Sequence, residues 1–125
     1  MDLRALPGTF AVCRLEAAEE LPAWFALAPP LAAAIRRRDE LSVVVGDDRV
    51  PPGVRAEHGW RALEVAGPLD FGLTGVMADL AGALAGAGVS VLPLATYDTD
   101  VILVRDERLD DAAAALRGAG HTVET

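Results

Sequence analysis

The sequence predicts an α+β fold whose second half follows the ferredoxin-like order β-α-β-β-α-β. Residues 60–104 read as a strand, a helix and two further strands, separated by a glycine-rich loop and by turns. A Gly-Ala-Gly segment occurs twice, at the start of residues 86–91 (Gly-Ala-Gly-Val-Ser-Val) and of residues 118–123 (Gly-Ala-Gly-His-Thr-Val), and each copy is predicted to join a helix to a strand. The first half of the chain looks like a shortened copy of this plan, with the order β-α-β-β.

In the first half, residues 9–15 favour a strand because β-branched and aromatic side chains are common there. Residues 23–27 are expected to form a short helix, since Pro22 suits a first helical turn and acidic residues precede it. Residues 31–38 have helical propensity, but they stand just before the clear strand at 41–46 and could pair with it as a hairpin. Propensity and context leave both readings of residues 31–38 open.

The second half is clearer. After a strand at 60–65, residues 67–72 contain too many glycine and proline residues to continue it. Residues 73–84 then carry helical spacing, which places five apolar residues on one face: Leu73, Val76, Met77, Leu80 and Leu84. The remaining predicted elements are strands at 90–96, 101–104 and 121–124, and a helix that begins after the N-cap Asp106 and ends at Gly118.

Composition excludes several classes of protein. The chain has 125 residues, of which 52% are hydrophobic, so it is long enough to bury a core. Its net charge of −8 argues against nucleic-acid or anionic-membrane partners. The single cysteine, Cys13, weakly suggests a reducing compartment, and residues 1–10 do not resemble a signal peptide. We therefore expect a soluble cytoplasmic protein that binds neither nucleic acid nor membrane.

No pattern of catalytic or metal-binding residues is apparent. The two histidines, His58 and His121, are far apart and lack the spacing of metal ligands. Ser42 and Ser90 have no recognisable histidine and aspartate partners, and no phosphate-binding Gly-x-x-x-x-Gly-Lys loop is present. We expect no enzyme activity, no metal and no cofactor, so the function should be one of binding.

Residues 67–104 resemble the ACT domain, and more narrowly the tandem-ACT proteins related to the eukaryotic cytosolic arginine sensors. The resemblance lies in a loop-helix pattern of Gly67, Leu69, Phe71 and Gly75, and in the turn Ala95-Thr96-Tyr97-Asp98-Thr99-Asp100. Ala95 departs from the pattern, since many relatives have serine there. The resemblance implies an ACT-like unit at residues 1–58 followed by an ACT domain at 59–125, and it favours a strand for residues 31–38.

The resemblance also implies a regulatory module that binds a small molecule, usually an amino acid, at an interface between ACT units. The helix N-terminus after Phe71 offers free N–H groups to a carboxylate, and glycines there allow a close approach. Carboxylates of the turn can accept an ammonium or a cationic side chain such as a guanidinium. The candidate ligand-binding residues are Asp70, Phe71, Gly72, Leu73, Thr74, Gly75, Thr96, Asp98 and Asp100.

Each candidate has a structural alternative. Asp98 and Asp100 flank a turn, where aspartate commonly bonds to nearby backbone, and Gly72 and Gly75 could serve only tight packing. Phe71 could be a core residue. The whole chain could also be a structural or interaction module that dimerises without a ligand. Exposed sheet edges and apolar helix faces of short ACT units predict a homodimer in either case.

Overall fold

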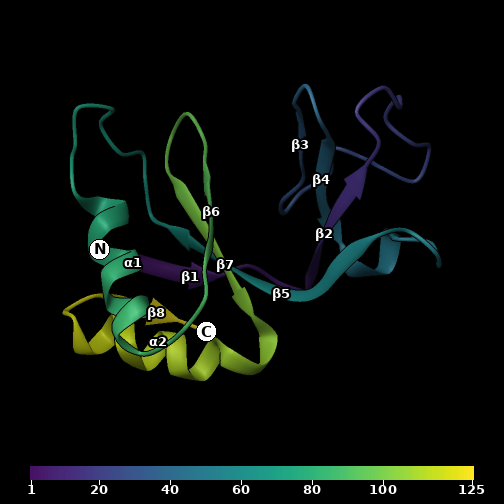
Figure 1. Cartoon of the computed structure of the whole chain (residues 1–125). Coiled ribbons are helices and arrows are strands. Elements are labelled where there is room, and N and C mark those ends of the chain that lie inside the picture. Colours follow the sequence, from purple (N-terminus) through teal and green to yellow (C-terminus); the bar gives the residue numbers. More distant parts are fainter. The chain divides into compact units, whose positions relative to one another are not determined.

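The computed structural model describes residues 1–125, and contacts divide the chain into two units (Figure 1). The larger unit consists of residues 1–6 and 61–125, and the smaller unit consists of residues 7–60. Strand β5 (Ala56–Val65) begins in the smaller unit and ends in the larger one. Sheet and helices together confirm the predicted α+β, ferredoxin-like class.

The larger unit has a sheet in the order β6-β7-β5-β1-β8, with two helices packed against it. From β5 onward, its elements follow the predicted order β-α-β-β-α-β. Figure 1 shows helices α1 and α2 in teal and yellow-green, and they contact one another. The elements after β5 are α1 (Val76–Gly86), β6 (Leu92–Ala95), β7 (Asp100–Arg105), α2 (Leu109–Gly118) and β8 (Thr122–Glu124).

Strand β1 (Asp2–Ala5) was not predicted. It lies between two other strands: Leu3 is opposite Val65 of β5 in an antiparallel pair and opposite Val123 of β8 in a parallel pair. The strand is only four residues long and fully buries only Leu3, so it carries almost no periodic signal. The chain leaves the larger unit after β1 and returns to it in β5. The assignment of residues 1–58 and 59–125 to separate ACT units stays a prediction.

The helices bury one face each against the strands of the larger unit. Leu80 and Leu84 of α1 are fully buried, as the spacing predicted. Helix α1 nevertheless begins at Val76, so the expectation that Leu73 lies on its buried face is wrong. Leu73 stands in a turn, with its N–H bonded to the carbonyl of Asp70 at 2.9 Å, and its side chain is exposed. The other core residues are Leu3, Leu63, Val65, Val89, Ile102, Val104, Leu109, Ala112, Ala113, Leu116 and Val123.

The start of the second helix also differs from the prediction. Asp106 is not its N-cap, because residues Asp106–Arg108 form a separate 3₁₀ turn, η2, and α2 begins only at Leu109. Arg108 occupies the N-cap position, and no side chain caps the helix there. The two acidic residues of the first turn, Asp110 and Asp111, still suit the positive end of the helix dipole.

The smaller unit is an antiparallel sheet in the order β3-β4-β2, completed by the first residues of β5. Its other strands are β2 (Phe10–Leu15), β3 (Ala33–Arg36) and β4 (Leu41–Gly46), followed by the 3₁₀ turn η1 (Asp47–Arg49). The open question at residues 31–38 is therefore settled as a strand, with Ala33 opposite Val44. Pairing with the strongly apolar β4 outweighs the helical propensity of the alanines.

The helix expected at residues 23–27 is absent. The segment between β2 and β3 consists of turns and irregular backbone, with one turn bond from Phe25 N–H to Pro22 O at 3.0 Å. Prolines at both ends leave too few residues to form a stable helix. Trp24 and Phe25 instead pack against the core of this unit, which contains Ala11, Cys13, Leu41, Val43 and Val45.

Candidate functional site

A hollow of about 280 Å³ lies in the larger unit, between the loop that precedes α1 and the turn that joins β6 to β7. Both walls belong to the segments that the sequence singled out. Two predicted residues, Gly72 and Thr74, do not line the hollow. The predicted residues that do line it are Asp70, Phe71, Leu73, Gly75, Thr96, Asp98 and Asp100.

The two walls are bonded to each other. Leu69 donates its backbone N–H to the carbonyl oxygen of Asp98 at 2.6 Å. Gly67 permits this close approach, because a Cβ atom there would lie 3.0 Å from the Asp98 carbonyl oxygen and 3.1 Å from Cβ of Thr99. Gly67 and Leu69 belong to the loop pattern of the sequence, but neither was among the predicted site residues. Their role is to hold the loop against the turn.

The first turn of α1 supplies hydrogen-bond donors to the hollow. Gly75 is the N-cap residue and has a φ angle of 84°, which favours glycine. No side chain caps this helix end, and the N–H groups of a first helical turn have no partner within the helix. Val76, Met77 and Ala78 all line the hollow. An oxygen anion in the hollow would therefore meet free N–H groups and the positive end of the helix dipole.

Asp70 is engaged locally. Its Oδ1 accepts the N–H of Gly72 at 2.8 Å, and its carbonyl oxygen accepts the N–H of Leu73. These bonds form the tight turn that places Gly75 at the start of α1. Asp70 thus shapes the loop, and one of its carboxylate oxygens is already occupied.

The β6–β7 turn is fixed by its two threonines. The Thr96 N–H donates to the carbonyl of Thr99 at 2.8 Å, and the Thr99 N–H donates to Thr96 Oγ1 at 3.1 Å. The Thr99 hydroxyl donates to the carbonyl of Val65 at 2.7 Å, which attaches the turn to the end of β5. The hydroxyl of Thr96 also donates to the Thr99 carbonyl, so this predicted ligand contact is used within the turn.

Unlike the threonine hydroxyl groups, the carboxylates of Asp98 and Asp100 are not bonded to other parts of the protein. Neither carboxylate makes a hydrogen bond or an ion pair; the bonds of these residues are made by the backbone, through the Asp98 carbonyl and the pairing of Asp100 with Ala95. Asp100, the first residue of β7, is half-buried at the wall of the hollow. These two carboxylates are therefore available to a ligand cation.

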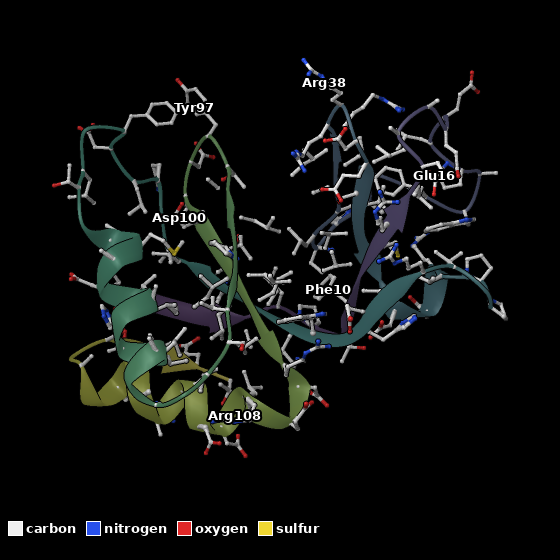
Figure 2. The ribbon with its side chains drawn as sticks, in the orientation of Figure 1. Phe10, Glu16, Arg38, Tyr97, Asp100 and Arg108 are labelled. Carbon is white, nitrogen blue, oxygen red and sulfur yellow. The ribbon has the colours of Figure 1, made fainter.

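Two aromatic side chains stand at the mouth of the hollow. Phe71 and Tyr97 meet edge to face, with ring centroids 4.8 Å apart and an angle of 83° between the rings. Figure 2 shows Tyr97 at the tip of the β6–β7 turn, reaching toward the loop before α1. Phe71 is 72% exposed and Tyr97 is 80% exposed, so the alternative that Phe71 is a core residue is wrong. Tyr97 belongs to the turn pattern of the sequence but was not among the predicted site residues.

The charged side chains that line the hollow are all acidic. Its lining contains Asp70, Asp98 and Asp100, and it contains no arginine or histidine. Among the lining groups, positive potential comes from the N-terminus of α1. The site can therefore accept a carboxylate at the helix and at least one cationic group beside the turn.

The other residues considered from sequence have structural settings. Cys13 is buried, and burial raises the pKa of its thiol, with a smaller contribution from the charge of Asp47. His58 Nδ1 lies 2.8 Å from Asp47 Oδ1, and His121 Nδ1 lies 3.1 Å from the N-terminal nitrogen. No group of three or more histidine, cysteine, aspartate or glutamate side chains is arranged to hold a metal ion. Neither helix has the length and hydrophobicity that crossing a membrane requires.

Comparison with known proteins identifies the family. The ACT domain model matches residues 55–118, and a second family model, describing an N-terminal domain, matches residues 8–53. A crystal structure of a protein from Agrobacterium tumefaciens is 34% identical, with a TM-score of 0.91 over 98% of this chain and 90% of that one. The chain belongs to the ACT domain family.

More distant structures share the fold. A Vibrio cholerae protein of unknown function, described as a possible transport protein, is 22% identical with a TM-score of 0.77, over 94% of this chain and 88% of that one. The ligand-free regulatory subunit of Thermus thermophilus aspartate kinase is 15% identical with a TM-score of 0.63, over 90% of this chain and 93% of that one. No curated protein sequence matches the chain.

Proposed function

We propose that this chain is a non-catalytic regulatory ACT-domain protein that binds an amino acid in the hollow between the α1 loop and the β6–β7 turn. One observation carries the proposal: free N–H groups at the start of α1 and two unpaired carboxylates, Asp98 and Asp100, line the same hollow. An α-amino acid carries the two complementary charges. Structures with the same fold include regulatory subunits of aspartate kinase, which supports a regulatory role.

The proposed binding mode follows from the two walls. The ligand carboxylate accepts N–H groups from Val76 and Met77, where the helix dipole is favourable. The ligand ammonium lies beside Asp100, and Asp98 stands nearer the tip of the turn. Charge-assisted hydrogen bonds of this kind contribute roughly 1.5–3 kcal/mol each. Phe71 and Tyr97 cover the ligand and exclude water from these bonds.

The charge of the hollow also sets an order of preference among amino acids. Three aspartates line it, and a second cationic group on the ligand would meet a carboxylate that the α-ammonium leaves free. An acidic side chain would instead add a like charge to the same walls. Amino acids with a cationic side chain should therefore bind more tightly than aspartate or glutamate.

The decisive experiment is a thermal-shift screen against the twenty L-amino acids, followed by isothermal titration of any that stabilise the protein. A ligand at about 100 times its Kd adds roughly 2.7 kcal/mol to the free energy of unfolding. Asp100→Asn should abolish or strongly weaken the response to amino acids with a cationic side chain. Asp39→Asn is the matched control, because Asp39 is an exposed aspartate in the β3–β4 turn of the other unit. No response to any amino acid would favour the alternative, a module that dimerises without a ligand.

We further propose that the ligand lies at an interface between ACT units and that the protein is a homodimer. Strands β3 and β6 are each paired on one side only, and Ile35 of β3 is 53% exposed. Unpaired edges of this kind are available to a second chain. If ligand binding and assembly are linked, saturating amino acid should tighten the dimer constant in analytical ultracentrifugation. An identical constant with and without ligand would refute the linkage.

A further inference from the structure

The same local structure occurs once in each unit. A hairpin with a four-residue turn is followed at once by a 3₁₀ turn that ends in arginine: β3, β4 and η1 in the smaller unit, and β6, β7 and η2 in the larger. Both hairpin turns close with one equivalent bond, from Arg37 N–H to Glu40 O and from Thr96 N–H to Thr99 O, each at 2.8 Å. Arg49 and Arg108 therefore hold equivalent positions.

In the larger unit this arginine has a structural task. The Arg108 guanidinium donates to the carbonyl oxygens of Gly88 at 3.2 Å and Ala87 at 3.3 Å, which are the residues that follow α1. It also donates to Asp111 at 2.9 Å. Each acceptor belongs to a helix or to the residues that end one. The arginine thus satisfies carbonyl groups that the end of α1 leaves unpaired.

In the smaller unit no helix stands before β3, and the equivalent arginine has no such acceptors. Arg49 makes no hydrogen bond and no ion pair, and it lines a hollow of about 430 Å³. This volume lies within the range of small-molecule sites, roughly 300–1,000 Å³. The hollow is thus lined by a guanidinium that, unlike that of Arg108, has no carbonyl groups at a helix end to bind.

The rest of the lining combines apolar side chains with one carboxylate. Phe10, Pro30 and Leu31 are among the apolar residues. Asp48, like Arg49, makes no hydrogen bond or ion pair. Its Oδ1 lies where a Cβ atom on Gly46 would be only 2.9 Å away, so the carboxylate folds back over the end of β4, beside the hollow.

The loop that closes the hollow offers further polar groups. Residues 26–32 make no backbone hydrogen bond outside the strands, although Ala26, Ala28, Leu31 and Ala32 line the hollow. Backbone N–H and C=O groups require partners, which here are water or a ligand. A ligand in this hollow would therefore meet unused donors and acceptors as well as two unpaired side-chain charges.

We propose that this hollow is a second ligand site, separate from the first, that binds an α-amino acid with an aliphatic side chain. Arg49 binds the carboxylate through its planar N–H groups, in place of the two carbonyls that Arg108 binds. Asp48 binds the ammonium. The apolar lining takes the aliphatic side chain, whose burial removes it from water. The charges of the lining suit a zwitterion, since a simple anion or amine would leave one of them unmatched.

The test is a titration of the full chain with L-leucine, followed by NMR chemical shifts of the Gly46 and Arg49 amides. Arg49→Gln and Asp48→Asn should each weaken binding at least tenfold, and both residues are exposed, so the fold should persist. The matched controls are Arg38→Gln and Asp39→Asn, exposed residues of the β3–β4 turn, which should bind as the parent does. 4-Methylpentanoate and 3-methylbutylamine, which lack the ammonium and the carboxylate respectively, should bind more weakly than leucine.

Two further measurements separate this site from the first. Asp100→Asn should leave the leucine-induced shifts at Gly46 unchanged, whatever happens to binding in the other hollow. Leucine binding that survives Arg49→Gln but is lost in Asp100→Asn would assign it to the first hollow and overturn the proposal. Absence of any shift at Gly46 with ~20 mM leucine would also overturn the proposal, because a site that pairs both charges of the ligand should bind at that concentration.

Discussion

The rings of Phe71 and Tyr97 meet edge to face at a centroid distance of 4.8 Å, although both side chains are largely exposed. One ring comes from the loop before α1 and the other from the β6–β7 turn, so the pair closes the mouth of the hollow between these segments. Exposed aromatic contacts of this kind contribute little to folding, because most of the ring surface remains in water. Because the two rings lie at the mouth of the hollow, we expect them to contribute to ligand binding and not to stability.

We therefore expect Tyr97→Ala to leave the free energy of unfolding within about 1 kcal/mol of the parent, as for most surface substitutions. The same substitution should weaken the binding of an amino acid in this hollow by about tenfold, because the tyrosine ring no longer shields the ligand from water. Chemical denaturation and isothermal titration measure the two effects. Leu27→Ala removes another exposed apolar side chain, 75% exposed in the smaller unit, and should change neither quantity. An unchanged Kd for Tyr97→Ala would separate the aromatic pair from binding.

Substitution by alanine should have opposite effects on stability at two glycines, Gly75 and Gly82. Gly75 has a φ angle of 84°, where an L side chain is strained, so Gly75→Ala should destabilise the protein by about 1–2 kcal/mol. Gly82 lies within α1, and apart from its chain neighbours and the nearby backbone of the helix itself no atom lies within 4 Å of the position that a Cβ would take. Gly82→Ala should therefore stabilise by about 0.5–1 kcal/mol.

Urea denaturation of the two glycine variants measures both changes under one set of conditions. Each variant serves as the other's control, because the added methyl group is the same. Equal signs would contradict the backbone conformation at residue 75. Gly75→Ala should also weaken ligand binding, because it disturbs the N–H groups of the first turn of α1.

Part of the fold could be predicted because its sequence signals are local and strong. The apolar residues 101–104 next to an acidic turn specify the β6–β7 hairpin, and the spacing of Leu80 and Leu84 specifies the buried face of α1. Strand β1 gave no such signal, because its pairing depends on β5 and β8, which lie far away in the sequence. The error at residues 23–27 arose because favourable residues at a helix start cannot compensate for a segment confined between prolines.

The site divides in the same way. Loop and turn were recognised from residue types, and the hollow brings most of the candidates together. Their individual tasks depend on bonds that no local pattern reveals. Asp70 and Thr96 are used within their own turns, whereas Asp100 is unpaired. The roles of Gly67 and Tyr97 become visible only when the loop and the turn are seen in contact.

The core of the larger unit should be sensitive to loss of volume. Leu84 is fully buried between α1 and the sheet, so Leu84→Ala should cost about 2–5 kcal/mol, from lost transfer free energy and the cavity left behind. Leu73→Ala is the control: Leu73 is 50% exposed in a turn, and its truncation should cost less than about 1 kcal/mol. Similar losses for both variants in urea denaturation would place Leu73 on a buried helix face after all.

The buried thiol of Cys13 predicts how stability depends on pH at alkaline values. Burial, with a smaller contribution from the Asp47 charge, raises the pKa of this thiol above its ordinary value of ~8.5. The unfolded chain then releases the proton at a lower pH than the folded protein does. The stabilisation is complete below the unfolded pKa, and it is lost as the pH rises from that value through the folded pKa.

The free energy of unfolding, measured by urea denaturation between pH 7.5 and 9.5, should therefore fall with pH more steeply for the parent than for Cys13→Ala. The alanine variant is expected to be less stable at every pH, because it removes a buried sulfur from the core that contains Leu41 and Val43. The difference between the two proteins should shrink as the pH rises, since only the parent has a thiol to titrate. Parallel curves would mean that the thiol ionises equally easily in both states, and would contradict its burial in the smaller unit.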